Sequence, residues 1–408
     1  MTEDTPGPAD VPQITPATLQ DRLDAGDPVR VLDLRDRDEV EQWRIAGPSV
    51  TLTQKANNRF VQARVTDAVD EFVADIDGEG SITVVCARGE ASAVVAEGLR
   101  EAGHDAHNLA GGMEAWARLV RTTELDADLP GDATLVQYRR PSSGCLGYLI
   151  VADDGETAAA GDAGAKRAAL VDPLAAFTER YLADLDERDA TLASVVDTHV
   201  HADHVSGLRD LADATGATPV MSERAVERGV TFADDIRTVT DGDELAVGNL
   251  SVEAVAAPGH TTGMVAFAVG DTLLTGDSLF VESVARPDLE RGAEGAADLA
   301  RDLYRTLTER FARFPDETVV APGHHAEGAR PATDGSVTAT LGACRELRVF
   351  GMAESEFVAY VTGDMPARPA NFERVIAINL GRESASEGEA FELELGPNNC
   401  AATPAAED

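Results

Sequence analysis

Short apolar runs, each followed by a polar turn, recur through the second half of the chain. Residues 192–196 predict a buried strand, and the apolar side chains of Val205, Leu208 and Leu211 then recur at helical spacing between 204 and 214. Further strands are predicted at 251–256, 271–274 and 317–320. Because each run ends in a turn, we expect the side chains of these turns to gather along one edge of a sheet.

The turns after these strands carry imidazole and carboxylate groups. Their His and Asp residues are His199, His201, Asp203, His204, His260, Asp277 and His324. Nitrogen and oxygen donors of this kind bind first-row divalent metals, and no Cys lies close in the sequence to make a soft sulfur site. Any one of them alone would be interpreted as a turn His or a helix-capping Asp. Their joint placement after successive strands predicts a metal site.

The His-rich turn resembles a known family. Residues 199–204 match the H-x-H-x-D-H signature of the metallo-β-lactamase superfamily, and His260, Asp277 and His324 match the later ligands of that family. The resemblance covers about residues 132–330. It implies an αββα sandwich with the metals at one edge.

Two reactions remain open for such a site. A thioester hydrolase similar to glyoxalase II would use all the ligands to hold two zinc or iron ions, with Asp277 shared between them. A persulfide dioxygenase of the same fold would hold one Fe(II) through His199, His260 and Asp277, and would leave positions open for a thiol persulfide and O2. We also expect a catalytic role for Asp203 besides metal binding.

Residues 275–280 and 284–289 resemble the persulfide dioxygenase pattern. In that pattern an Arg follows the metal-binding Asp and supports substrate binding, and Arg286 takes this place. The alternative for Arg286 is an ordinary ion pair, because Asp288 and Glu290 are near in the sequence.

A cysteine follows another predicted strand, at 81–85. Cys86 lies between this strand and a helix that carries Val94, Val95 and Leu99. Backbone N–H groups of a tight loop and a helix N-terminus favour a thiolate, and Arg88 would add to the effect. A buried, inert thiol is the alternative. The other three cysteines are scattered and fit neither a disulfide framework nor a zinc spacing; they are Cys145, Cys344 and Cys400.

The surroundings of Cys86 resemble a rhodanese domain over about residues 12–119. Residues 31–35 match the early Asp-x-Arg strand of that family, 86–92 its active-site loop and 111–116 its closing turn and helix. The resemblance implies that Cys86 carries a sulfane sulfur as a persulfide, with Arg88, Gly89 and Ser92 lining the substrate loop. Arg44 stands where the family often has His.

We therefore expect a rhodanese-like domain at 12–121, a linker at 122–134, a metallo-β-lactamase-like domain at 135–335 and a C-terminal extension at 336–408 that packs on the metal domain. The tip from 401 onward is expected to be disordered. No apolar run is long enough to span a bilayer and the first residues lack the features of a signal peptide, so we expect a cytoplasmic protein.

The balance of Lys+Arg 34 against Asp+Glu 73 gives a net charge of −39. Such a surface should repel nucleic acid and anionic membranes, and its even spread fits adaptation to high salt. A homodimer is compatible with the sequence.

The joining of the two domains favours one function. A rhodanese-like domain makes or consumes persulfides and a dioxygenase converts a small thiol persulfide and O2 into sulfite and free thiol, so one domain supplies what the other uses. We therefore predict a persulfide dioxygenase and sulfurtransferase fusion with one Fe(II) per chain. The alternatives are a hydrolase with two Zn²⁺ per chain and a non-catalytic sulfur carrier or thiol-binding sensor.

Overall fold

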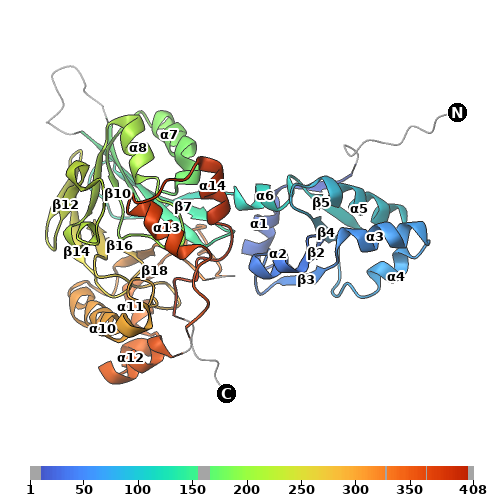
Figure 1. Cartoon of the computed structure of the whole chain (residues 1–408). Coiled ribbons are helices and arrows are strands. Elements are labelled where there is room, and N and C mark those ends of the chain that lie inside the picture. Colours follow the sequence, from blue (N-terminus) through green and yellow to red (C-terminus); the bar gives the residue numbers. More distant parts are fainter. Residues whose placement is uncertain (1–10, 155–165, 327–328, 364, 403–408) are drawn as a thin grey trace.

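The computed structural model describes residues 11–154, 166–326, 329–363 and 365–402. Two α/β bodies lie side by side, and the C-terminal helices pack on the larger one close to the junction (Figure 1). No helix within these ranges combines the length and the apolar character needed to cross a membrane.

The N-terminal body is built on a five-stranded parallel sheet with the order β1-β5-β4-β2-β3. Its strands are β1 Gln13–Ile14, β2 Val29–Asp33, β3 Val50–Gln54, β4 Ile82–Val85 and β5 Ala106–Leu109. Its helices are α1 Pro16–Ala25, α2 Arg37–Gln42, α3 Asn57–Val65, α4 Val69–Val73, α5 Glu90–Glu101 and α6 Gly112–Ala117. Because parallel strands need crossover connections, the helices cover both faces and β4 is buried along its whole length.

The larger body holds two packed sheets. The first has seven strands in the order β12-β11-β10-β9-β8-β7-β6, and the second has six in the order β13-β14-β15-β16-β17-β18. The first sheet consists of β6 Arg121–Glu124, β7 Thr134–Arg140, β8 Cys145–Asp153, β9 Lys166–Val171, β10 Ala190–Val196, β11 Thr218–Ser222 and β12 Arg237–Val239. The second consists of β13 Glu244–Val247, β14 Leu250–Ala256, β15 Val265–Val269, β16 Thr272–Gly276, β17 Val319–Pro322 and β18 Ala339–Thr340.

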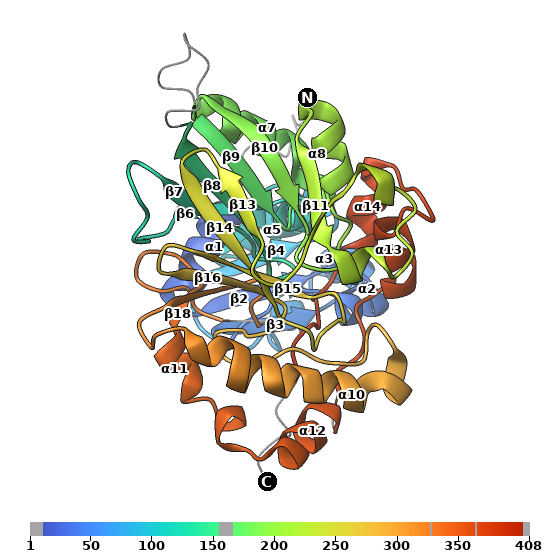
Figure 2. The same cartoon turned by 90° about the vertical axis from the view of Figure 1, so that its left-hand side faces the viewer.

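Helices cover the outer face of each sheet, which completes the predicted αββα sandwich (Figure 2). The helices of this body are α7 Thr178–Glu187, α8 Leu208–Thr215, α9 Glu223–Val226, α10 Gly292–Arg305, α11 Leu341–Arg345, α12 Glu354–Thr362, α13 Phe372–Asn379 and α14 Glu387–Leu393. Of these, α12 packs on α10, and α13 and α14 pack against the segments that contain Ala175 and Val205. Alternate residues of β9 show the reason for the layers: Ala169 and Val171 join the core between the sheets, whereas Ala168 and Leu170 join the core under α7 and α8. The expected fold class is confirmed for both domains.

Three local expectations differ from the structure. Residues 122–124, at the start of the expected linker, belong to β6, which pairs with β7. The helix expected from 204 begins only at Leu208, because the bond from Leu208 N to the His204 carbonyl that would start it is not made: Leu208 N donates to Ser206 Oγ, and the His204 carbonyl accepts from Asn379. At the C-terminus Ala401 pairs with Ala285 and Ala402 is buried, so the expected disorder does not include these two residues. Residues 403–408 lie outside the described residues.

Candidate functional site

The ends of four strands bring the predicted metal ligands to one edge of the sandwich. The His-rich loop follows β10, His260 follows β14, Asp277 follows β16 and His324 follows β17. Because β16 and β17 are parallel neighbours with Gly276 opposite Pro322, Asp277 and His324 lie next to each other. All seven side chains are buried, with exposed fractions between 0% and 7%.

Three ligand atoms converge without partners. His199 Nε2 lies 3.8 Å from Asp277 Oδ2, and His260 Nε2 lies 3.6 Å from the same oxygen. Among the described residues none of these three buried atoms has a hydrogen-bond partner. Buried polar atoms are rarely left in this state, because their desolvation is unfavourable. Two imidazoles and one carboxylate that face a common point fit a 2-His-1-carboxylate metal site.

The hydrogen bonds of Nδ1 in His199 and His260 determine the tautomer of each imidazole. His260 Nδ1 lies 2.8 Å from the carbonyl oxygen of Arg286, so it must donate. Thr198 Oγ1 donates to Asp172 Oδ2 and therefore accepts from His199 Nδ1 at 2.9 Å. In both imidazoles Nε2 then keeps its lone pair, as metal binding requires.

The charges also fit metal binding. Burial lowers the pKa of His260 and, with the help of the neighbouring His201, lowers that of His199 well below its usual value. Burial would raise the pKa of Asp277, but His324, His199 and His260 outweigh it and hold this pKa below its usual range. Neutral imidazoles beside an ionised carboxylate are the forms that bind a metal.

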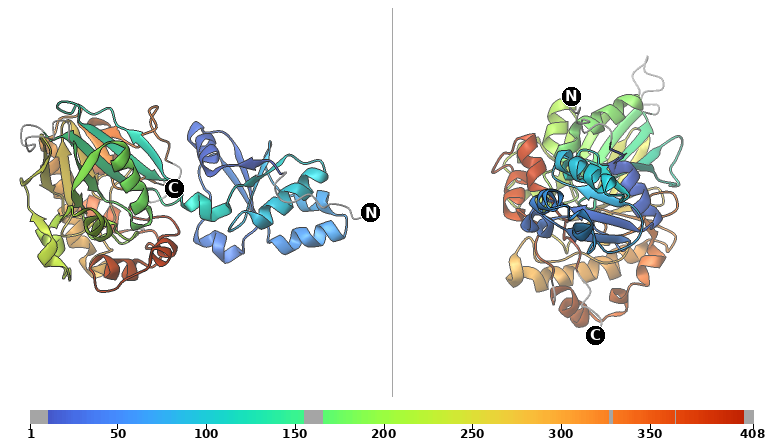
Figure 3. Two further views of the ribbon diagram at one scale, coloured as in Figure 1. Left: turned by 90° about the horizontal axis from the view of Figure 1, so that it is seen from above. Right: turned by 90° about the vertical axis from the view of Figure 1, so that its right-hand side faces the viewer.

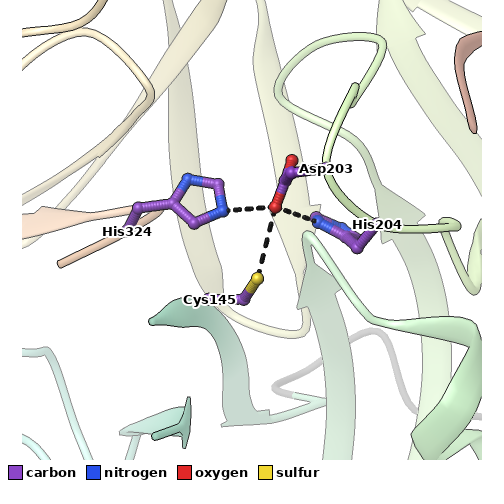
Figure 4. Close-up of side chains that lie close together, drawn as sticks. All are labelled: Cys145, Asp203, His204 and His324. Atoms are coloured by element: carbon purple, nitrogen blue, oxygen red, sulfur yellow. Dashed lines mark hydrogen bonds and ion pairs between the residues drawn. The ribbon is translucent and has the colours of Figure 1, made fainter. Parts of the chain in front are cut away.

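A second group lies beside the first and is internally hydrogen-bonded (Figure 4). Asp203 Oδ2 lies 2.8 Å from His324 Nε2, 3.1 Å from His204 Nδ1 and 3.2 Å from Cys145 Sγ. His324 Nδ1 lies 2.6 Å from Asp277 Oδ1, so both nitrogens of this ring face carboxylates. Burial opposes the charge of His324, but Asp277 and Asp203 overcome it and raise its pKa well above the usual value.

His201 has a different environment from the other ligand candidates. Its Nε2 lies 3.1 Å from Asp172 Oδ1, which also accepts from the Thr198 N–H at 2.7 Å. Its Nδ1 is buried and has no partner among the described residues. Asp172 therefore orients both the start of the His-rich loop and one of its imidazoles, a role that the sequence did not reveal.

Residues far away in the chain position this loop. Asn379 Nδ2, at the end of α13, donates to the carbonyl oxygens of His201 at 3.0 Å and His204 at 2.8 Å, and Asn379 Oδ1 accepts from Ser206 N at 2.9 Å. Glu394 accepts from Val205 N at 2.9 Å through one oxygen. Nothing in the local sequence around Asn379 or Glu394 signals these contacts.

Two cysteines to which the sequence analysis assigned no role lie next to the site. Cys145, which begins β8, contacts Asp203, and its position just before a long apolar run was the available signal. Cys400 lies near Asp277 and His324. Burial, together with the charges of Asp203 and Asp277, raises the pKa of the Cys400 thiol well above its usual value, which favours the protonated form.

Arg286 has structural contacts in this arrangement. It is 1% exposed, and its guanidinium donates to both carboxylate oxygens of Asp288 and to the carbonyl oxygens of Ala367 and Asn399. It therefore ties the C-terminal extension to the metal domain. Direct substrate binding by Arg286 stays a prediction.

The second candidate site surrounds Cys86. Its Sγ accepts from Gly89 N at 3.1 Å, Ser92 N at 3.4 Å and Ser92 Oγ at 3.1 Å. These donors stabilise negative charge on sulfur. Arg88 points instead to Glu114, at 3.6 Å, and its side chain is 76% exposed. Gly112 closes the loop, since a Cβ there would lie 2.4 Å from the carbonyl oxygen of Cys86.

Comparisons with known proteins identify both domains. The Metallo-beta-lactamase superfamily is matched over residues 163–324, and the Rhodanese-like domain over 15–119. The chain is 30% identical over 204 residues to "Persulfide dioxygenase ETHE1, mitochondrial" of Bos taurus, a match that covers 49% of this chain and 71% of the relative. It is also 33% identical to the uncharacterized protein ML0493 of Mycobacterium leprae, over 34% of this chain and 72% of that relative.

Among solved structures, ETHE1 from Myxococcus xanthus is 30% identical, with a TM-score of 0.50, and the match covers 60% of this chain and 98% of that protein. The relationship supports a metal-dependent enzyme. The chain therefore belongs to the metallo-β-lactamase superfamily, as a relative of the ETHE1 persulfide dioxygenases, and carries a rhodanese-like domain before that fold.

Proposed function

We propose that the metal domain oxidises a low-molecular-weight thiol persulfide with O2, and that Cys86 transfers sulfane sulfur in the rhodanese-like domain. The observation that carries the first part is the convergence of three unpartnered donor atoms from His199, His260 and Asp277. The relationship to ETHE1 proteins supports the choice of reaction.

In this proposal one Fe(II) is held by His199, His260 and Asp277. The ion would supply open coordination positions for O2 and for the persulfide, and would mediate electron transfer between them. The overall reaction is balanced when a persulfide, O2 and water give sulfite, the free thiol and protons. The terminal sulfur is oxidised and O2 is reduced.

The chain's own side chains have separate tasks. Thr198 and the Arg286 carbonyl orient the two imidazoles, and the buried position of the ligands excludes bulk water. His324 holds a proton between the carboxylates of Asp277 and Asp203. A proton at this place offsets negative charge from an anionic persulfide.

The contacts of the second group favour one metal over two. A dinuclear thioester hydrolase would need Asp203, His204 and His324 as ligands. Here Asp203 Oδ2 accepts from both imidazoles, and His324 has no free nitrogen. Asp203 Oδ1 and His204 Nε2 have no partner among the described residues, but a second metal bound through His324 would break a hydrogen bond of this ring and require it to lose a proton, so we place the two-zinc reaction second.

For the sulfurtransferase, the thiolate of Cys86 attacks the outer sulfur of a donor such as thiosulfate. A sulfur–sulfur bond forms at Cys86 while the donor's bond breaks and sulfite leaves. A small thiolate then attacks the outer sulfur, which restores Cys86 and releases a thiol persulfide. Gly89 and Ser92 stabilise the anionic sulfur in both states. The released persulfide is the substrate of the metal domain.

Metal content and O2 uptake test the proposal together. Protein loaded with iron without oxygen should hold about one iron per chain and consume O2 with a small thiol persulfide, producing sulfite. His260→Ala should lose the iron, His324→Ala should keep most of it, and His104→Ala is the matched control because His104 lies in the other domain beside Asp70. Equal metal loss in His260→Ala and His324→Ala, or rapid thioester cleavage without O2 uptake, would overturn the proposal.

A further inference from the structure

We propose that the rhodanese-like domain forms one wall of the substrate entrance to the metal site, and that Arg44 in this wall selects thiols that carry a carboxylate. The inference rests on the proposed function of the metal domain and adds the substrate class. It assigns the N-terminal domain a second task, which is independent of sulfur transfer at Cys86.

A cleft of about 550 Å³ lies between the two domains. The rhodanese-like domain contributes Asp24, Trp43 and Arg44 to its lining, and the metal domain contributes Ser143, Phe280 and His324. This volume lies in the usual range for small-molecule sites. Because His324 is hydrogen-bonded to Asp203 and Asp277, the cleft ends at the group of metal-site residues.

Ion pairs and hydrogen bonds hold the two walls together. Arg139 on β7 donates to Asp24 on α1 at 3.0 Å, and Arg121 donates to Asp21 at 2.7 Å. Arg140 Nε donates to the Ala117 carbonyl oxygen at 3.0 Å, with the Arg140 side chain 2% exposed. The two domains therefore lie side by side with α1 toward the metal domain (Figures 1 and 3). A side chain of the rhodanese-like domain can thus be a fixed part of the entrance.

The charges in the cleft favour an anionic ligand. Asp24 is paired with Arg139, and Glu41 is paired with Arg37 at 2.7 Å. Arg44 is exposed, and within the described residues its side chain has neither an ion pair nor a hydrogen-bond partner. Arg44 is therefore the guanidinium in the lining of this cleft that is free to pair with a ligand, since Arg139 is already paired with Asp24. Its guanidinium is suited to a carboxylate, which it can bind through two N–H groups.

The cleft serves the metal site and not Cys86. Its lining from the rhodanese-like domain includes Asp24 and residues 46–49, which precede the amino ends of β2 and β3. Cys86 follows the carboxyl end of the parallel strand β4 and does not line the cleft. A thiol persulfide bound in this cleft would place its carboxylate at Arg44 and direct its terminal sulfur toward His324. Trp43 would lie beside the bound persulfide.

The two tryptophans of the chain, Trp43 and Trp116, both line this cleft, so intrinsic fluorescence reports directly on binding. The probes are 3-mercaptopropionate, which is anionic, and 2-mercaptoethanol, which is neutral. Wild-type protein should bind the anionic thiol more tightly than the neutral one. Arg44→Ala should weaken binding of the anionic thiol by about tenfold and leave the affinity for the neutral thiol unchanged. Arg224→Ala is the control, because Arg224 is exposed on α9 away from the cleft.

Steady-state kinetics with the persulfides of the same thiols provide the second readout. Arg44→Ala should raise KM for the anionic persulfide by a similar factor while kcat stays unchanged. Equal effects of Arg44→Ala and Arg224→Ala would overturn the inference. So would an Arg44→Ala variant that binds the anionic and the neutral thiol with equally reduced affinity. If wild-type protein consumes no O2, the proposed function fails, and the fluorescence titration still decides whether Arg44 selects carboxylates.

Discussion

Asn379→Ala should loosen the His-rich loop although Asn379 touches no ligand atom that faces the metal position. The side chain is 6% exposed and makes three hydrogen bonds to the backbone of residues 201–206. Alanine leaves two carbonyl oxygens and one N–H of the loop without these partners. The substitution therefore tests whether the C-terminal extension helps to build the site.

The size of the effect follows from these three groups. An unsatisfied buried group costs about 1–3 kcal/mol, and water that enters the space left by the amide keeps each cost near the lower value. We expect the metal domain to lose about 3 kcal/mol of stability. Because the loop carries His199, His201 and His204, iron affinity should also fall, by about ten- to a hundredfold.

Two measurements check this prediction. Thermal unfolding followed by circular dichroism gives the midpoint of the metal domain, and competition with a chelator under anaerobic conditions gives the iron affinity. Asn249→Ala, at an exposed Asn in the turn before β14, is the matched control. If Asn379→Ala unfolds and binds iron as the wild type does, the hydrogen bonds of Asn379 do not determine the loop geometry.

Three further predictions concern the sulfur loop and the C-terminal extension. Gly112→Ala places a Cβ 2.4 Å from the Cys86 carbonyl at a backbone φ of +62°, so sulfur loading of Cys86 should be lost while O2 uptake with preformed persulfide remains; unchanged loading would show that the loop tolerates the side chain. Intact-mass analysis after incubation with thiosulfate should show an added sulfur on wild type and on Cys344→Ser but none on Cys86→Ser, and retention on Cys86→Ser would assign the sulfur to another cysteine. Burial opposes the ionisation of Asp288, but the nearby Arg286 outweighs burial and lowers the pKa of Asp288. The ionised Asp288 therefore stabilises the folded protein fully above about pH 4, and this stabilisation is lost as the pH falls through the lowered pKa. Limited proteolysis should therefore release the extension in acid from wild type, and Asp288→Asn should show this release already at neutral pH; equal resistance of the two proteins at neutral pH would contradict it.

The positions of the candidate metal ligands could be predicted because each depends on local features. His260, Asp277 and His324 each follow an apolar strand, and the chemistry of imidazole and carboxylate does not depend on the rest of the chain. The neighbouring parallel strands β16 and β17 bring Asp277 and His324 together, whereas the His-rich loop follows a strand of the other sheet and meets them only where the two sheets pack. The Cys86 loop is similar, since its donors, Gly89 and Ser92, lie within six residues of the sulfur.

The sequence alone therefore determined the fold class, the order of the domains and the side chains that form both candidate sites. Tertiary structure decided which ligand atoms are free, because His324 is bound between Asp203 and Asp277 only when β17, β16 and the His-rich loop are packed together. It also brought Asn379 to a loop that lies 175 residues earlier and placed Arg44 in a cleft that His324 of the other domain also lines. Contacts at such separations leave no periodicity or spacing in the sequence, since they depend on how whole layers pack and not on neighbouring residues.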